Sequence, residues 1–230
     1  MEVIPINGLS NFFSGLDWSV PVSILMSVIP ALICITFHEL SHGFVAYKLG
    51  DTTARDMGRL TLNPIKHIDI LGLIMMATVG FGWAKPVPVN MYRFKNPKAG
   101  MAVTALAGPL SNVLLAAFIL LIYGFVYIPL YELGTVGYYI MQMIQTTAYL
   151  SCALAIFNII PISPLDGSKV LFSFLPSNTY DKLMRYERFG MILLIVIVYL
   201  DILTPFLTTA TQWLYGGLIH IAQWSLSLTL

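Results

Sequence analysis

The stretch "WSVPVSILMSVIPALICITFHELSHGFVAY", residues 18–47, contains a single formal charge, Glu39, and that charge stands between two histidines. A membrane-spanning helix needs about 20 predominantly apolar residues, so this stretch is long enough to cross a bilayer. An ionisable side chain is costly at membrane depth and usually faces a functional cavity. The stretch therefore predicts a transmembrane helix that carries a polar site.

The whole chain has the composition of a membrane protein. Hydrophobic residues make up 57% and charged residues 10% of its 230 residues, against roughly 45–50% and 25% in soluble domains. Residues 99–131 and 133–165 contain no charge, and residues 189–200 and 205–230 are further candidate spans. We predict one all-α polytopic membrane domain over residues 1–230. The net charge of +1 gives no reason to expect a nucleic-acid partner.

The positions of the basic residues predict the topology. The twelve lysines and arginines all lie in three connecting segments, and the positive-inside rule places such segments in the cytoplasm. About five transmembrane helices follow, with the N-terminus outside and the C-terminus inside. The first set of basic residues is Lys48, Arg55, Arg59 and Lys66, the second is Lys85, Arg93, Lys95 and Lys98, and the third is Lys169, Lys182, Arg185 and Arg188.

The apolar segment Ile70–Ala84 lies between two of these basic segments, so it cannot simply cross the membrane. It is fifteen residues long and is interrupted by Gly72, Gly80 and Gly82. Backbone without regular helical hydrogen bonds is tolerated at membrane depth where other protein covers it. We therefore expect a re-entrant element here.

Within the first helix, "HELSH" places His38 and His42 four residues apart, on one face of the helix. Two histidines at this spacing can bind one zinc ion, and Glu39 beside them can accept a proton from water without being a ligand. The same three residues could instead pack between helices or hydrogen-bond a neighbour. The membrane setting favours the metal site, because intramembrane ionisable residues usually have a function.

A zinc site with two histidines needs a third protein ligand. Asp166 lies in "NIIPISPLDGSKV", residues 158–170, where two prolines end a straight helix and the Asp-Gly pair suits a tight turn. Such a break can direct the carboxylate back toward the first helix, or it can leave a solvated aspartate at a helix end. The predicted topology favours Asp166, since Glu132 and Asp201 fall on the other side of the membrane.

The segment "ALAGPLSNVLL", residues 105–115, combines small residues with one side-chain amide. Small residues allow another helix to approach closely. Asn112 could hydrogen-bond a neighbouring helix, or beside a zinc site it could donate to a developing oxyanion. Asn158 presents the same two alternatives.

The motifs "HELSH", "AGPLSN" and "NIIPISPLDG", on successive predicted helices, together resemble the site-2 proteases, which are intramembrane zinc metalloproteases. The segment "GRLTLNPIKHIDILGLIM" is similar to the compact bacterial members of that family. The resemblance covers about residues 30–175 and implies a catalytic core at about residues 20–175, with additional transmembrane helices at about residues 186–230. The sequence contains no recognisable PDZ-like or nucleotide-binding CBS domain.

The resemblance implies hydrolysis of peptide bonds in or near the transmembrane segments of single-pass membrane proteins. It implies one zinc ion per chain and a location in the lipid bilayer of the bacterial cytoplasmic membrane. The basic segments and the nearness of His38 and His42 to the cytoplasmic end of the first helix predict an active site nearer the cytoplasmic side. No oligomeric state is implied. The implied zinc ligands are His38, His42 and Asp166, the implied general base is Glu39, and the residues implied to assist at the scissile carbonyl or to orient the site are Asn112 and Asn158.

Two other classes of protein remain open. A metal transporter, or a metal-binding membrane protein without proteolytic activity, would need ligands along a path across the bilayer. Outside the cluster, the sequence offers only isolated polar residues such as Gln142, Gln145 and His220. A catalytically inactive scaffold would have no physical need for Glu39.

A helical substrate must unwind locally before cleavage, and its freed backbone groups then need new partners. The segment "WAKPVPVNMYRF", residues 83–94, contains two prolines that exclude an ordinary helix, whereas Val87 and Val89 favour extended structure. We expect a short extended segment near the cytoplasmic face. It is either an edge that binds substrate through Val87 and Val89 by strand addition or a plain surface loop.

Overall fold

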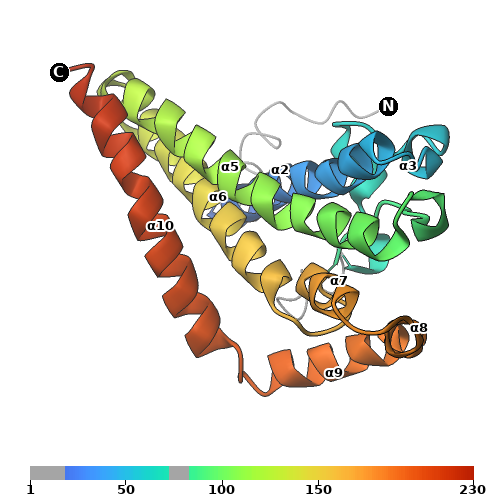
Figure 1. Cartoon of the computed structure of the whole chain (residues 1–230). Helices are drawn as coiled ribbons and strands as arrows, with labels where there is room; N and C mark the ends of the chain where they lie inside the picture. The colour runs from blue at the N-terminus through green and yellow to red at the C-terminus, as the bar shows by residue number, and fades with distance from the viewer. Residues whose placement is uncertain (1–18, 73–82) are drawn as a thin grey trace, which may run out of the picture.

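The computed structural model describes residues 19–72 and 83–230, and this part of the chain contains helices and no β-strand. Three helices are long and apolar enough to span a membrane: α2 (Ser19–Lys48), α5 (Pro97–Glu132) and α6 (Thr135–Ile159). They form the bundle at the centre of Figure 1. The prediction of an all-α integral membrane protein is therefore confirmed.

Local sequence sets the ends of these helices. Asn96 is the N-cap of α5: its side-chain oxygen accepts a hydrogen bond from the Ala99 backbone N–H, and Pro97 occupies the first helical position. α2 ends just before Gly50, and α5 is joined to α6 by a turn at Gly134. Both glycines have a positive φ, 105° and 60°, which residues with a side chain rarely adopt. α5 can therefore turn back sharply into α6.

α5 is the central helix and packs against α2, α6 and α10 (Thr204–Ser227). The Ser151 hydroxyl of α6 donates a hydrogen bond to the Asn112 carbonyl of α5 at 2.8 Å, and the Gln145 amide donates to the Tyr123 hydroxyl at 2.8 Å. Such polar contacts hold helices together in a lipid environment, where apolar side chains gain little by avoiding lipid. The buried apolar side chains of the same region are Leu120, Tyr123, Ala148 and Ala222.

Between α2 and α5 the chain forms a cap at one end of the bundle. The cap contains α3 (Thr53–Asp56) and two 3-10 turns, η1 (Pro64–His67) and η2 (Met91–Arg93). Residues 83–90, predicted to be extended, have no regular secondary structure and form no strand. The re-entrant element predicted for Ile70–Ala84 falls mostly outside the described residues.

After α6 the chain forms α7 (Asp166–Ser173), α8 (Ser177–Arg185) and α9 (Glu187–Tyr199), followed by α10. α9 has 13 residues, and at 1.5 Å per residue it reaches about 20 Å, less than the roughly 30 Å of the hydrocarbon core. It meets α10 at an angle of 86°, so that the two helices together form at most one bent span. In the described part of the chain there are thus three or four candidate spans, and the count of five is not confirmed.

α10 returns to the end of the bundle at which α5 turns into α6 (Figure 1). Gly124, near the end of α5, packs so tightly against Ser225 and Ala222 of α10 that a side chain could not fit between the helices. The C-terminus therefore lies beside the α5–α6 turn, at the end opposite α7. The C-terminus inside the cell stays a prediction; if α9 and α10 form one bent span, the C-terminus lies on the side opposite the basic segments.

Candidate metal centre

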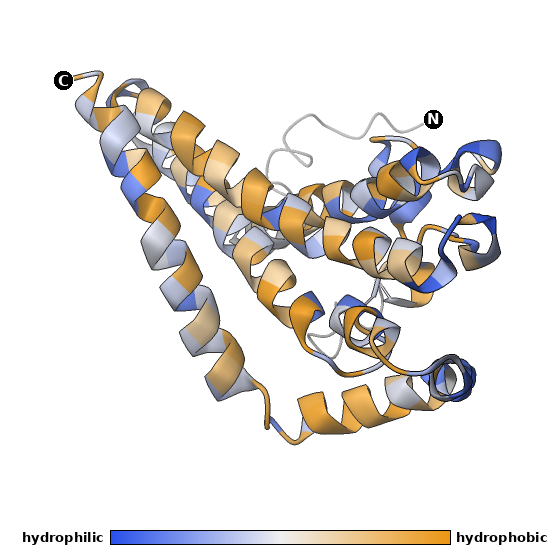
Figure 2. Ribbon diagram, in the orientation of Figure 1, coloured by the Kyte–Doolittle hydropathy of each residue, from blue (hydrophilic) through white to orange (hydrophobic). Residues whose placement is uncertain are grey.

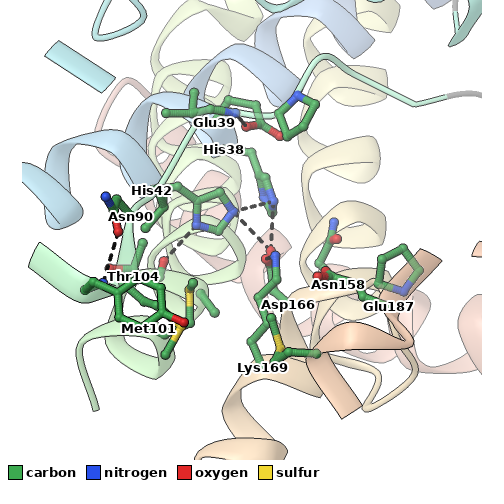
Figure 3. A pocket seen from close by; sticks show the side chains of 18 residues that line it. His38, Glu39, His42, Asn90, Met101, Thr104, Asn158, Asp166, Lys169 and Glu187 are labelled. Atoms are coloured by element: carbon green, nitrogen blue, oxygen red, sulfur yellow. Dashed lines mark hydrogen bonds and ion pairs between the residues drawn. The ribbon is translucent and has the colours of Figure 1, made fainter. Parts of the chain in front are cut away.

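His38 and His42 of α2 meet Asp166, the first residue of α7 (Figure 3). Asp166 Oδ2 lies 3.1 Å from His38 Nε2 and 3.1 Å from His42 Nε2, and the two Nε2 atoms are 3.0 Å apart. Donors of a tetrahedral zinc site with metal bonds of about 2.0–2.1 Å lie roughly 3.3 Å apart. Among the described residues, this is the one group of three side chains whose donor atoms could hold a metal ion.

The break after α6 brings Asp166 to the histidines. α6 ends at Ile159, a loop follows, and α7 begins at Asp166. Gly167 packs directly against the Ile159 carbonyl oxygen, which leaves no space for a side chain. Leu165 is buried in an apolar cluster with Ile160. The predicted break in "NIIPISPLDG" therefore returns the carboxylate to the first helix instead of leaving it in solvent.

The second ring nitrogen of each histidine is also engaged. His42 Nδ1 lies 2.7 Å from the Thr104 carbonyl oxygen, to which it can only donate. His38 Nδ1 lies 3.2 Å from the Asn112 side-chain nitrogen, and the buried Asn112 Oδ1 has no hydrogen-bond partner. A 180° rotation of this amide would let Oδ1 accept a hydrogen bond from His38 Nδ1.

Donation from Nδ1 of His42 to the Thr104 carbonyl, and from Nδ1 of His38 to a rotated Asn112 amide, would leave both Nε2 atoms unprotonated for a metal ion. This is the usual arrangement of histidine ligands in metal sites, where a carbonyl or carboxylate fixes the tautomer and the ring orientation. The donor atoms, their spacing and these supporting hydrogen bonds fit a zinc ion held by His38, His42 and Asp166.

Gly108 of α5 forms the wall behind the two imidazoles. A Cβ atom at this position would lie 2.5 Å from Cε1 of His38 and 2.5 Å from Cε1 of His42. One turn later, the Ser111 hydroxyl lies 3.5 Å from the Phe37 carbonyl oxygen of α2. The small residues of "AGPLSN" thus allow close helix packing, as the sequence predicts. The direct contact of Gly108 with the histidines was not predicted, because it depends on the register between two helices.

Glu39 lies beside this cluster and is not one of its three members. Its Oε2 atom accepts a hydrogen bond from the Val87 backbone N–H at 2.7 Å. Glu39, Val87 and Val89 all line a cavity of about 530 Å³, which also contains the three candidate ligands. The glutamate therefore faces a space large enough for several residues of a peptide.

Further hydrogen bonds attach residues 83–90 to the cap. The Lys85 backbone N–H donates to the His67 carbonyl at 2.9 Å, and the Arg59 guanidinium donates to the Lys85 carbonyl at 2.8 Å. The Asn90 backbone N–H donates to the fully buried Asp51 carboxylate at 2.6 Å. The segment is therefore a fixed wall of the cavity.

Asn158, near the end of α6, also lines this cavity. It lines a second, smaller cavity of about 190 Å³ as well, together with His38 and Glu39. Its amide donates a hydrogen bond to the Leu154 carbonyl at 3.0 Å. The structure therefore brings Asn158 to the cavity wall, whereas it buries Asn112 behind His38.

Lys169 is a polar residue of the site that sequence reasoning missed. Its Nζ atom lies 3.7 Å from Asp166 Oδ1, the carboxylate oxygen not bonded to the histidines. Burial would raise the pKa of Asp166, but the hydrogen bonds with His38 and His42 and the charge of Lys169 hold that pKa well below its usual value. The carboxylate is therefore ionised, which zinc binding requires. The only sequence signal for Lys169 is its position three residues after Asp166, on the same helix face.

Comparison with known proteins agrees with this geometry. Residues 26–200 match Peptidase family M50. The chain is 39% identical over 176 residues to YwhC of Bacillus subtilis, named as a candidate zinc metalloprotease, with 74% of this chain and 78% of that protein covered. It is 34% identical to a candidate zinc metalloprotease of Methanocaldococcus jannaschii, with 73% and 80% covered.

Rip2 of Mycobacterium tuberculosis, also named as a candidate zinc metalloprotease, is 27% identical to the chain, with 82% of this chain and 73% of Rip2 covered. No solved structure matches the chain significantly. The family match covers most of the chain and includes all three candidate ligands and Glu39. The chain therefore belongs to Peptidase family M50, the site-2 protease family, and is a zinc metalloendopeptidase.

Proposed function

We propose that this protein cleaves peptide bonds in or near the transmembrane segments of single-pass membrane proteins, within regulated intramembrane proteolysis. One observation carries this proposal: His38, His42 and Glu39 lie on α2, a helix apolar enough to span a membrane, and open onto a cavity shared with Asp166. A protease site on a membrane-spanning helix meets its substrates in the bilayer. The positions of the basic residues support an active site nearer the cytoplasmic side of the bacterial cytoplasmic membrane.

His38, His42 and Asp166 would hold one zinc ion per chain. The ion supplies Lewis acidity, which makes water a nucleophile at neutral pH. Glu39 accepts the proton of the attacking water and delivers it to the departing amine. In the structure the Val87 N–H fixes one oxygen of the Glu39 carboxylate. Among the described residues the other oxygen has no hydrogen-bond partner, which suits this proton transfer.

The two asparagines take different parts in this proposal. Asn112 is fully buried and lies against His38 Nδ1, so it orients a zinc ligand. Asn158 lines the cavity itself and is the better placed of the two to donate a hydrogen bond to the scissile carbonyl.

The wall formed by residues 83–90 is the proposed substrate-binding edge. Val87 and Val89 line the cavity, which supports contact with an unwound substrate. The Val87 N–H is already bonded to Glu39, so pairing with substrate would use the other backbone groups of this segment. Strand addition of this kind supplies the hydrogen bonds that an unwound helix has lost.

Reconstituted protein with Glu39→Gln tests the proposal. The variant should retain zinc, because the ligands are unchanged, and should lose cleavage of a single-pass reporter protein, because the base is removed. Glu132→Gln is the matched control, since Glu132 lies at the far end of α5, and it should cleave at the normal rate. Cleavage by the Glu39→Gln variant at the normal rate would contradict the mechanism.

Zinc flux measured in vesicles that contain the reconstituted protein distinguishes a protease from the alternative, a metal transporter. A transporter would carry zinc across the membrane at a rate that Glu39→Gln leaves unchanged, and it would not cut the reporter. A protease should show no zinc flux above protein-free vesicles.

A further inference from the structure

Two charged side chains of the cap are buried, although the cap is polar. Hydrophilic colours gather in this part of the chain in Figure 2, and its charged residues Arg55, Asp56 and Lys66 are exposed. Asp51, by contrast, is fully buried, and Arg59 is only 8% exposed. Burial of a charge is costly unless hydrogen bonds replace the lost water. The contacts of Asp51 and Arg59 therefore show what their burial serves.

The Asp51 carboxylate joins the beginning of the cap to the segment that lines the main cavity. One oxygen accepts hydrogen bonds from the backbone N–H and the hydroxyl of Thr53. The other oxygen accepts a hydrogen bond from the Asn90 backbone N–H at 2.6 Å. The Arg93 guanidinium lies 4.0 Å from the carboxylate. One side chain thus fixes the position of Asn90 relative to the end of α2.

Arg59 makes the corresponding attachment five residues earlier in the same segment. Its guanidinium donates a hydrogen bond to the Lys85 carbonyl at 2.8 Å. The Lys85 side chain itself is exposed, so Arg59 holds the backbone and not the charge of this residue. Buried side chains of opposite charge therefore hold the two ends of residues 85–90.

Val87 lies between these two attachments and contacts the glutamate of the site. Its backbone N–H donates to Glu39 Oε2 at 2.7 Å. Its buried side chain packs against α2, with Cγ1 3.0 Å from the position that a Cβ would take at Gly43, one turn after Glu39. A displacement of either end of the segment would therefore move the group that holds the Glu39 carboxylate.

We propose that Asp51 and Arg59 are positioning residues for Glu39, and that they act through the backbone of residues 85–90. Neither residue lines the main cavity, so neither meets a substrate there. The inference rests on the proposed function, in which Glu39 is the general base. A role in stability alone would bury the same side chains, but it would leave the geometry at Val87 unchanged when one of them is replaced.

The variants Asp51→Asn and Arg59→Met test the proposal by their kinetics. An asparagine offers one acceptor oxygen in place of two, and a methionine has no donor. In each variant kcat for a single-pass reporter should fall by about 10–100-fold, because a small displacement of a catalytic group costs this much. Zinc content should stay normal, since the ligands are unchanged.

Asp56→Asn is the matched control. Asp56 also bonds to the cap, through Thr52 and Arg55, but it is exposed and has no contact with residues 85–90. Its replacement should leave kcat unchanged. A normal kcat in Asp51→Asn or in Arg59→Met would overturn the role proposed for that residue.

Hydrogen exchange of the zinc-loaded protein, followed by mass spectrometry, separates positioning from a role in stability alone. Asp51→Asn and Arg59→Met should each speed exchange of the Val87 amide and leave α5 and α6 as protected as before, whereas Asp56→Asn should change neither. Unchanged exchange at Val87, or faster exchange throughout the bundle together with loss of zinc, would refute the proposal. Exchange is measured without substrate, so it does not depend on whether Glu39 is the base. Failure of the proposed function would instead appear as normal cleavage by Glu39→Gln.

Discussion

At the scale of single residues, the metal centre depends on the absence of a side chain at Gly108. Gly108 has no Cβ, and the imidazoles of His38 and His42 occupy the space in which one would stand. The rings are thus confined between α5 on one side and Asp166 on the other. The geometry of the zinc site is therefore set partly by a residue that offers no ligand atom.

Gly108→Ala should lower zinc affinity by about 10–100-fold, the usual effect of disturbing groups that support a ligand. The added methyl group must displace both imidazoles or the whole of α5. Zinc content of the purified protein, measured by elemental analysis, checks the expectation. Gly217→Ala is the control, since no atom lies near its Cβ position. Full zinc occupancy in the Gly108 variant would show that the helices adjust freely.

The candidate ligands could be predicted from sequence for definite reasons. The spacing of His38 and His42 follows directly from helix geometry, and Asp166 follows from the position of the chain break and from the basic loops. Thr104 could not be predicted, because it contributes only its backbone carbonyl, a group that every residue has. Gly108 carries a signal for helix packing, but nothing in the sequence says which side chains it meets.

At the scale of elements, the segment of residues 83–90 differs most from expectation. Its prolines correctly excluded an ordinary helix, but the extended segment expected here has no regular secondary structure and forms no strand. The hydrogen bonds of this segment run to side chains of α2 and the cap, including Glu39 and Asp51. A hydrophobic pattern predicts which face of an element is buried. It does not predict that a backbone N–H hydrogen-bonds a carboxylate far away in the sequence.

Proline substitutions at Val87 and Val89 distinguish two uses of this segment. Val87→Pro removes the N–H bonded to Glu39, so it should abolish most cleavage while zinc content stays normal. Among the described residues the Val89 N–H has no partner, so Val89→Pro should impair cleavage only if that group pairs with substrate. Cleavage rates of a single-pass reporter, with zinc measured in parallel, check both variants. Normal cleavage by Val87→Pro would show that the bond to Glu39 is dispensable.

At the scale of the whole molecule, the run lengths of apolar residues predicted α2, α5 and α6 but not the path of the chain after α8. The two last helices are joined at a tight turn in which Asp201 has a φ of 57°. This turn lets α10 run back along α5 and α6, whereas hydropathy alone counted α9 as a crossing. A sharp change of direction leaves little trace in composition, so the sequence could not predict that α9 and α10 meet at 86°.

Cysteine labelling in sealed vesicles checks this topology. Leu133→Cys, in the α5–α6 turn, and Thr229→Cys, near the C-terminus, should react with a membrane-impermeant reagent from the same side. Lys182→Cys, on α8, should react only from the other side. All three positions are exposed in the structure. Labelling of positions 229 and 182 from the same side would instead support the five spans predicted from the sequence.

The large sequence separation between Asp166 and His38 has a consequence for stability. These residues are 128 positions apart in the chain, so a shared cation acts as a crosslink that closes a very long loop. Closing a loop of about 100 residues with a disulfide stabilises a free chain by roughly 4–5 kcal/mol, and the membrane-held helices α5 and α6 would reduce that benefit.

Removal of the cation should therefore loosen the junction between α2 and α7, beyond its effect on the chemistry. Added trypsin should cut after Lys182 and Arg185 of α8 sooner once zinc is chelated, and zinc re-addition should restore resistance. Equal digestion rates with and without zinc would show that packing alone holds the junction. A cation that fastens the first membrane helix to the last third of the chain makes the fold itself depend on metal supply.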